Sequence, residues 1–239
     1  MTGRGMLLLR LGKTVFLAGA VLVLLYQVGI FILVLWYGFF NPSSTSIMQQ
    51  TLRELRREDP EAQLLHEWVP YDQISTNLKR AVVASEDSNF INHSGVEWDD
   101  IRRAWEYNRR QAAQGRQAMR GGSTISQQLA KNLFLSNSRS YLRKGQELII
   151  TYMIELTMSK RRILELYLNY AQWGENVFGA QAAARRYYKT DAAKLGPSQS
   201  ARLASMLPRP AYYDRNGVTS YLRSRTSTIQ QRMRLVEVP

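Results

Sequence analysis

The chain has 239 residues, 45% of them hydrophobic, which is enough for one good-sized domain and an appendage. It contains no cysteine, which excludes disulfides, a thiolate nucleophile and cysteine-based metal sites. Because 32 Lys and Arg outnumber 19 Asp and Glu, the net charge of +13 predicts an anionic partner, such as nucleic acid, an anionic membrane surface or a phosphorylated substrate.

The N-terminal stretch discriminates among these partners. Residues 14–40 carry no charge, and they exceed the roughly 20 residues needed to span a bilayer. Residues 1–13 contain Arg4, Arg10 and Lys13 but no acid, so the positive-inside rule places them in the cytoplasm. A cleavable signal peptide is the alternative, but the apolar run is too long and ends without a small-residue cleavage site. We therefore expect one uncleaved transmembrane helix over residues 14–40.

This anchor predicts the location of the protein and the nature of its partner. We expect a single-pass protein of the cytoplasmic (inner) membrane, whose larger part is periplasmic or extracellular. An exported domain rarely meets nucleic acid, so no nucleic-acid partner is expected. Anionic membrane lipids or a polyprenyl diphosphate account for the positive charge more economically.

The segment after the anchor is expected to be a linker. Residues 41–50 are polar, with a proline and several serines, and residues 51–66 have helical spacing that Pro60 interrupts. We expect a stalk over residues 41–66 and one folded domain over residues 67–239. Almost no period-2 alternation follows, so this domain is predicted to be mainly α-helical.

A carboxylate ends one apolar helical stripe. Leu78, Val82 and Glu86 recur at i, i+4 and i+8, so a helix over residues 75–86 would place Glu86 where another apolar residue would otherwise lie. Such a carboxylate must be paired or lie in a cleft. The alternative is a helix that ends at Ser85, which would leave Glu86 as a solvated loop residue.

A basic region follows. Residues 98–110 are expected to be helical, and residues 111–120 are rich in Gln, Ala and Gly. The pattern is typical of a solvated, mobile loop, and beside a membrane such a loop would contact anionic headgroups. Few acids offset its arginines, which are Arg102, Arg103, Arg109, Arg110, Arg116 and Arg120.

Residues 120–136, RGGSTISQQLAKNLFLS, predict an amphipathic helix with Ser123 as its N-cap. One face is apolar, with Ile125, Leu129 and Leu133. Two interpretations of the opposite face stay open: a solvated surface, or amides and hydroxyls that bind sugar hydroxyls and phosphate oxygens. That face carries Thr124, Gln127, Gln128 and Lys131.

A second acid lies on the helix expected over residues 139–158. Glu147 shares a stripe with Ile150 and Ile154, and Arg143 precedes it by four residues. An ordinary Arg143–Glu147 surface pair is the alternative interpretation, and it would contribute only a few tenths of a kcal/mol.

Taken together, these segments resemble a known family. EDSNFINHSG, then GGSTISQQLAKN, then RKGQE followed by a Ser-Lys-x-x-Ile-Leu-Glu-x-Tyr-Leu-Asn run, closely resemble the ordered motifs of the peptidoglycan glycosyltransferases, glycosyltransferase family 51. The resemblance runs from about Trp68 to Tyr213. Because no second domain and no Ser-x-x-Lys nucleophile motif follow, the chain resembles the monofunctional biosynthetic peptidoglycan transglycosylases rather than bifunctional penicillin-binding proteins.

The resemblance implies a lysozyme-like, mostly helical domain with a smaller membrane-proximal basic lobe near residues 103–122. It implies that Glu86 and Glu147 are the catalytic glutamates, and that Asp87 and His93 have supporting roles. Gln199-Ser200-Ala201 departs from the usual Glu-Ser-Ala, which puts in doubt any role for an acid there. The substrate-binding positions that it implies are Ser123, Thr124, Gln127, Gln128, Lys131, Arg139, Arg143 and Lys144, with Asp87 and His93 included among them.

The implied reaction is polymerisation of lipid II into β-1,4-linked glycan strands, with inversion and release of a polyprenyl diphosphate. In this interpretation Glu86 is the general base, and Lys131 and Arg139 neutralise the leaving diphosphate. Glu147 either orients these cations or holds a divalent ion, Mg or Mn. No Asp-x-Asp motif is present to hold such an ion tightly.

Three other interpretations compete with this one. An anchored lysozyme-like hydrolase would share the fold and need a carboxylate pair, a non-catalytic wall-binding protein would not need Glu86, and a nucleic-acid binder would explain the charge but not the anchor. The transferase interpretation leads because of the resemblance. Its expected partners are lipid II, the growing glycan strand, membrane lipids, and proteins of cell-wall synthesis or division.

Overall fold

The computed structural model describes residues 3–116, 121–138 and 140–239, without the side chains of residues 3–10. The chain divides into two compact units, Met1–Phe40 and Asn41–Pro239.

The first unit is one long helix, α1 (Gly3–Phe39). Its segment Leu11–Phe39 has 29 residues and a mean hydropathy of 2.5, so by length and composition it is able to cross a membrane. Large apolar side chains such as Phe16 and Leu22 are exposed along it. This helix fits the predicted membrane anchor, although it begins well before residue 14.

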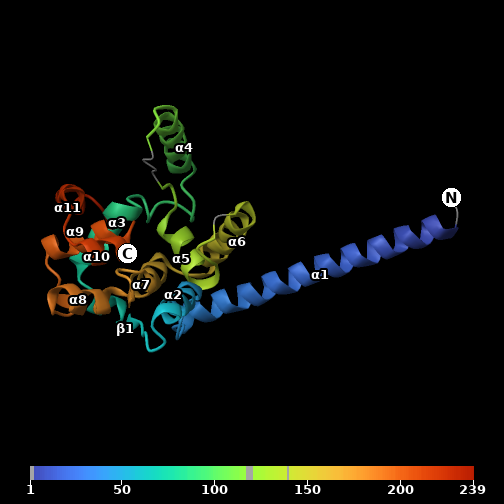
Figure 1. Cartoon of the computed structure of the whole chain (residues 1–239), viewed down its shortest axis with the longest axis horizontal. Helices are drawn as coiled ribbons and strands as arrows, with labels where there is room; N and C mark the ends of the chain where they lie inside the picture. The colour runs from blue at the N-terminus through green and yellow to red at the C-terminus, as the bar shows by residue number, and fades with distance from the viewer. Residues whose placement is uncertain (1–2, 117–120, 139) are drawn as a thin grey trace. The chain divides into compact units, whose positions relative to one another are not determined.

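The regular secondary structure of the second unit is mostly helical (Figure 1). Two short strands, β1 (Leu65–His66) and β2 (Val177–Phe178), pair in parallel, with Leu65 opposite Val177. Two 3-10 turns, η1 (Tyr71–Gln73) and η2 (Ala192–Lys194), lie between helices. The helices described in this unit are α2 (Ser46–Glu58), α3 (Thr76–Glu86), α4 (Trp98–Ala113), α5 (Ile125–Phe134), α6 (Tyr141–Thr157), α7 (Lys160–Tyr170), α8 (Ala180–Tyr188), α9 (Pro197–Met206), α10 (Pro210–Asn216) and α11 (Ser220–Arg232).

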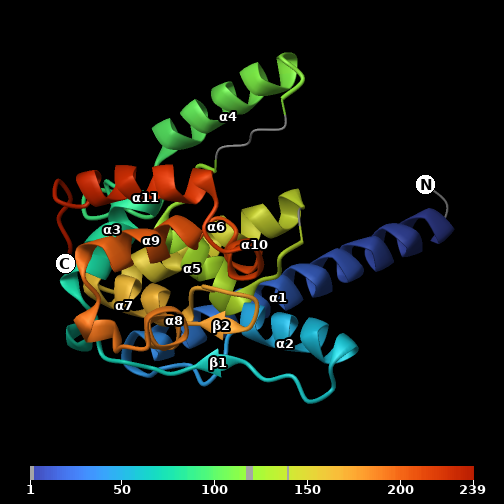
Figure 2. The same cartoon turned by 60° about the vertical axis from the view of Figure 1, so that its left-hand side comes forward.

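Helix α5 lies at the centre of the unit, where it packs against α6 and α7. The predicted apolar face is confirmed, because Ile125, Leu129 and Leu133 are all buried. On another side of the core, α3 packs on α9, and α11 lies across both of them (Figure 2). Burying these apolar faces on one another is the main source of stability of such a helical unit.

The segment predicted as a stalk is part of the folded unit. Helix α2 packs on α5 and buries Ile47, Met48 and Thr51, which share one face of the helix. Thr45 caps its first turn by accepting a hydrogen bond from the Met48 N–H at 3.3 Å. The structure therefore differs from the expected stalk over residues 41–66, because a short apolar stripe in a polar stretch is enough to dock a helix.

Helix α4 projects from the other helices of the unit in both views (Figure 1; Figure 2). Ala104 is its one buried residue. At Gly122 an added Cβ would lie 3.1 Å from the Ile101 Cα and 3.2 Å from the Ala104 Cβ, so α4 approaches this loop through small residues. The helix covers part of the smaller basic lobe predicted near residues 103–122. Arg120 lies outside the described residues.

Candidate active site

Glu86 is the last residue of α3, and its side chain is 11% exposed. The predicted helix over residues 75–86 is therefore confirmed, and the alternative of a solvated loop residue is wrong. Ser85 Oγ donates to Glu86 Oε1 at 2.8 Å, and Gln128 Nε2 donates to Oε2 at 3.1 Å. The carboxylate is held from two sides and keeps a small opening to solvent.

Gln128 connects Glu86 to the core. Its Oε1 accepts a hydrogen bond from the Tyr167 hydroxyl at 3.0 Å, which orients the amide so that its Nε2 faces Glu86. Burial, and after it the negative charges of Glu86 and Asp87, raises the pKa of the Tyr167 hydroxyl, so that this group stays a donor. Gln128 thus holds the carboxylate in place, whereas the sequence had predicted only a substrate contact.

Arg225 is a residue of this site that the sequence did not predict. Its Nη2 donates to Ser85 Oγ at 3.0 Å and lies 3.6 Å from Glu86 Oε1. A signal for it exists, because Arg225 falls between Leu222 and Ile229, the two buried residues of α11, at helical spacing. A cation on an apolar stripe, like the acid at Glu86, is expected to have a partner of opposite charge.

Asp87 and His93 hold the loop between α3 and α4 and connect it to the start of α5. His93 Nδ1 accepts from the Gly95 N–H at 2.9 Å, so the ring proton lies on Nε2, which donates to the Asp87 carboxylate at 2.9 Å. Asp87 Oδ2 also accepts from the N–H of Ile125, the first residue of α5, at 3.0 Å. Both side chains are buried, and their contacts fit the supporting roles predicted for them.

The N-terminus of α5 is capped by Thr124, so the prediction of Ser123 as the N-cap is wrong. Thr124 and Gln127 form a reciprocal capping box, with bonds of 3.2 and 3.0 Å, and both residues are buried. Their polar groups hold the helix end in place. Ser123 does not cap the helix, and its Oγ accepts a hydrogen bond from Lys144 Nζ at 3.0 Å.

Glu147 is buried, with a side chain only 4% exposed, and it binds two cations. Arg143 Nη1 lies 2.6 Å from its Oε2, and Lys144 pairs with its Oε1. An ordinary surface pair does not describe this arrangement, because the acid is enclosed and the Arg143 side chain is only 17% exposed. Glu147 fixes the position of both cations.

Lys131 adds a third positive charge beside Glu147. Burial lowers the pKa of Lys131, the negative charge of Glu147 opposes that shift, and Arg143 and Lys144 reinforce it. Within the described parts of the chain, no hydrogen bond engages its ammonium group. Three cations around one carboxylate leave an excess of positive charge, which suits an anionic ligand such as a diphosphate.

The residues around Glu147 do not fit a divalent cation. Both of its carboxylate oxygens face cationic side chains, Arg143 and Lys144, which would repel a metal ion. In residues 3–116, 121–138 and 140–239 no group of three His, Cys, Asp or Glu side chains could hold a metal. Glu147 is therefore better suited to orienting the cations.

Helix α5 joins the two glutamates into one site. Gln128 reaches Glu86, and Lys131, one turn further along, lies beside Glu147. Arg139, predicted to lie near the same diphosphate, is outside the described residues.

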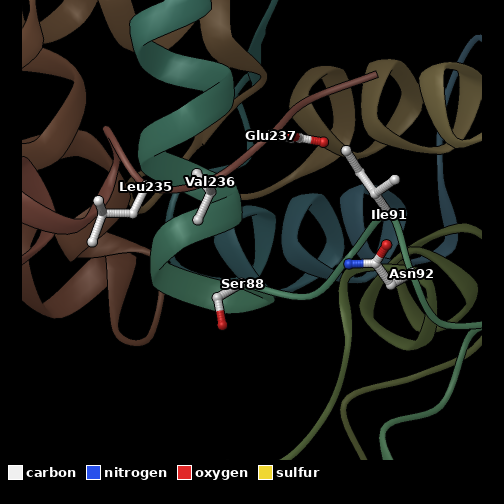
Figure 3. Close-up of a pocket in the computed structure, with 6 residues that line it drawn as sticks. All are labelled: Ser88, Ile91, Asn92, Leu235, Val236 and Glu237. Atoms are coloured by element: carbon white, nitrogen blue, oxygen red, sulfur yellow. The ribbon is translucent and has the colours of Figure 1, made fainter.

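A pocket lies between the loop after α3 and the C-terminal segment (Figure 3). None of the predicted site residues lines it, so no catalytic role is assigned to it. Its lining residues are Ser88, Ile91, Asn92, Leu235, Val236 and Glu237.

Comparison with known proteins identifies the family. The Transglycosylase family model matches residues 49–234. A biosynthetic peptidoglycan transglycosylase of Bordetella pertussis is 62% identical over 238 residues, which cover 100% of this chain and 98% of the relative. Proteins with the same name from Herminiimonas arsenicoxydans (55% identical, 91% of this chain and 93% of the relative) and Aromatoleum aromaticum (52%, 97% and 98%) are also similar. This chain belongs to the Transglycosylase family.

Proposed function

We propose that the chain polymerises lipid II into β-1,4-linked glycan strands of peptidoglycan and releases a polyprenyl diphosphate. One observation carries this proposal. Helix α5 contacts both the Glu86 carboxylate, which hydrogen bonds hold in place, and the cluster of cations around Glu147. The first suits deprotonation of a hydroxyl and the second suits a diphosphate leaving group. The relatives named as biosynthetic peptidoglycan transglycosylases support the same reaction.

Glu86 is the proposed general base. The acceptor is the 4-hydroxyl of a lipid-linked disaccharide, which is a poor nucleophile until a base accepts its proton. The hydroxyl oxygen attacks the anomeric carbon from the face opposite the diphosphate, and the bonding electrons leave with the diphosphate oxygen. This inverts an α donor to a β linkage. Ser85 and Gln128 hold the carboxylate while the proton moves to it.

Lys131, Arg143 and Lys144 are the proposed cations for the leaving diphosphate. Positive charges fixed before the reaction stabilise negative charge as it develops, without reorganisation. Glu147 orients Arg143 and Lys144, and Arg139 is proposed to join them on the strength of the resemblance. Thr124, Gln127, Asp87 and His93 are proposed to act by holding α5, with Ser123 and Gln128 nearer the substrate. No step is assigned to a divalent ion.

The direct test is polymerisation of labelled lipid II by the purified full-length chain in detergent, with product length read by gel electrophoresis and linkage by muramidase digestion. Growth of glycan chains from lipid II supports the proposal. Shortening of preformed glycan without synthesis would instead support a hydrolase, and binding without turnover would support a wall-binding protein.

The pH dependence should reveal the role of Lys131. A lysine is charged below its pKa, and burial lowers the pKa of Lys131 below the ordinary 10.5. Its charge is therefore lost at a lower pH than that of an exposed lysine, and the polymerisation rate should fall on the alkaline side. Lys131→Arg should keep the charge and extend activity to higher pH, because arginine stays protonated.

The measurement is the initial polymerisation rate from about pH 7 to about pH 10, the interval below the ordinary lysine pKa. Lys194→Arg, at an exposed lysine of η2, is the matched control and should leave the profile unchanged. An identical alkaline limb in the parent and Lys131→Arg would contradict a charge role for Lys131 at the diphosphate.

Membrane lipids are a proposed second partner, through α6 as well as α1. At 100° per residue, five apolar side chains of α6 fall within about 100° of one another. Tyr141, Leu142 and Leu156 are 98%, 89% and 81% exposed, and Ile149 and Tyr152 are about half exposed. We propose that this stripe lies in the outer surface of the cytoplasmic membrane, with the N-terminus cytoplasmic and residues 41–239 periplasmic or extracellular.

Leu142→Glu combined with Leu156→Glu should lower the polymerisation rate about tenfold in proteoliposomes and little in detergent, because a carboxylate disfavours the lipid interface. Ser224→Glu with Gln231→Glu on α11 adds the same charge at exposed positions and is the control. Equal losses in detergent and in bilayers would argue against a lipid contact.

A further inference from the structure

Arg225 is separated by well over a hundred residues from Glu86, yet its guanidinium lies beside that carboxylate. Nη2 donates to Ser85 Oγ at 3.0 Å, and Ser85 Oγ donates to Glu86 Oε1 at 2.8 Å. The direct distance from Nη2 to Glu86 Oε1 is 3.6 Å. Arg225 therefore reaches one oxygen of the carboxylate, whereas Gln128 reaches the other.

The placement of Arg225 is costly for the fold. Helix α11 packs on α3 and α9 through Leu222 and Ile229, and Arg225 lies on the same inward side, with a side chain 28% exposed. Its Nε is buried and has no hydrogen-bond partner among the residues that the structure describes. A buried, unpaired N–H of a charged group destabilises a protein, and an apolar residue would pack at this position without that penalty.

Glu86 needs a cation from outside its own helix. It is the C-terminal residue of α3, where the helix dipole presents partial negative charge and disfavours an anion. Asp87 follows directly and brings a second negative charge, while Tyr167 and Gln128 are neutral. Within the described residues, Arg225 is the cationic side chain that lies beside Glu86.

We propose that Arg225 is a positioning residue for Glu86. Arg225 acts through Ser85 to fix one oxygen of the Glu86 carboxylate, and its positive charge offsets the partial negative charge at the C-terminal end of α3. This inference rests on the proposed function, in which Glu86 is the general base. Arg225 takes no proton and contacts no substrate in this role. Its contribution is a carboxylate that is correctly oriented when the acceptor hydroxyl arrives.

A positioning role predicts a specific kinetic pattern. Arg225→Gln should lower kcat roughly tenfold, a fraction of the about 10²–10⁴-fold that a general base contributes, and should leave KM for lipid II within about twofold. Arg225→Lys should recover part of the loss, since it restores the charge without the forked geometry. Arg223→Gln, two residues away on α11 and exposed, is the matched control and should behave as the parent.

A double-mutant cycle tests the path through Ser85. If Arg225 acts through Ser85, the loss in Ser85→Ala with Arg225→Gln should be much smaller than the product of the two single losses. A second measurement does not depend on turnover. The ¹³C NMR resonance of the Glu86 side-chain carboxyl can be assigned by comparison with Glu86→Gln. This resonance should show increased motion of the carboxyl in Arg225→Gln and no increase in Arg223→Gln.

Three results would overturn the proposal. A raised KM with an unchanged kcat would make Arg225 a substrate-binding residue. Equal losses in Arg225→Gln and Arg225→Lys, accompanied by a lower thermal midpoint and an unchanged Glu86 resonance, would make it a structural residue. Kinetics and a Glu86 resonance like those of the parent would exclude any role. Because the NMR measurement needs no activity, a parent that fails to polymerise lipid II would refute the proposed function separately.

Discussion

Replacing Glu86 with Gln is expected to reduce lipid II polymerisation by about 10²–10⁴-fold, the range that a general base contributes. The substitution keeps the size of the side chain. Its one amide oxygen still accepts the hydrogen bond from Gln128 Nε2, while its amide nitrogen takes the place of Oε1 beside the Ser85 hydroxyl, which is able to rotate and accept. It cannot take up the proton of the acceptor hydroxyl. The loss should therefore appear in kcat, with the thermal midpoint and the KM for lipid II little changed.

The measurement is the initial rate of chain growth on labelled lipid II for the parent, Glu86→Gln and a control. Glu54→Gln removes the same charge from an exposed position on α2 and should retain the rate of the parent. If Glu86→Gln keeps most of its rate while the parent is active, the function stands but the base is misassigned, and Glu147 becomes the next residue to test.

The geometry around Glu86 also separates transfer from hydrolysis. A lysozyme-like hydrolase needs a second carboxylate free to act as nucleophile or to activate water. The neighbouring acid, Asp87, is buried and already accepts hydrogen bonds from His93 and from the Ile125 N–H. Its oxygens serve the loop and the start of α5, so Asp87 is poorly placed for such chemistry. This arrangement favours an activated donor, whose diphosphate leaves with the help of cations.

The helices that carry the site were predictable because their periodicity is local. Leu78, Val82 and Glu86 lie at helical spacing, and the structure places them on one side of α3 with Glu86 still in the helix. The apolar face of α5 followed from the same reasoning. In both cases the pattern runs from i to i+8, about two turns of helix, and the packing of the core agrees with it.

The N-cap of α5 is a case in which the local sequence offers two candidates. Ser123 and Thr124 are both good N-cap residues, and adjacent candidates differ only in what lies three positions further on. Gln127 completes a capping box with Thr124, whereas the corresponding partner of Ser123 would be Ser126. A search for that reciprocal pair would have found the correct cap from the sequence.

Contacts between segments that are distant along the chain could not be predicted from the sequence. The pairing of Arg225 with Ser85 and Glu86 joins the last helix of the chain to α3, and no local pattern specifies which cation meets which acid. The docking of α2 was missed for a related reason. The buried face of α2 is short, and it stabilises the fold only because it meets a complementary surface on α5, which cannot be read from the sequence of α2.

Replacing Glu147 with Gln is expected to lower the polymerisation rate by about 10²-fold, comparable to the loss of one preorganised electrostatic donor. The change removes the charge that holds Arg143 and Lys144, and the remaining positive groups should repel one another. With Lys131 nearby, the cluster would open and no longer match a diphosphate. Unpairing the partly buried Arg143 should also lower the free energy of unfolding by about 1–3 kcal/mol.

Glu155→Gln is the matched control for that loss of stability. Glu155 lies on the same helix and is also enclosed, and it pairs with Lys160 at 2.8 Å and accepts from Ser126. Its replacement should destabilise the protein by a similar amount, yet cost far less activity per folded molecule, because its partners are not those proposed for the diphosphate. Similar specific activities for the two variants would remove Glu147 from the catalytic machinery.

A chelation experiment on the same variants decides between the two roles considered for Glu147. If it orients cations, EDTA should slow the parent and Glu147→Gln by the same factor, because the loss in the variant comes from displaced side chains. If it instead holds Mg or Mn, EDTA should reduce the parent to the level of the variant and leave Glu147→Gln unchanged. The pairing of both Glu147 oxygens with Arg143 and Lys144 leads us to expect the first result, since a metal would have to displace two cations already bound there.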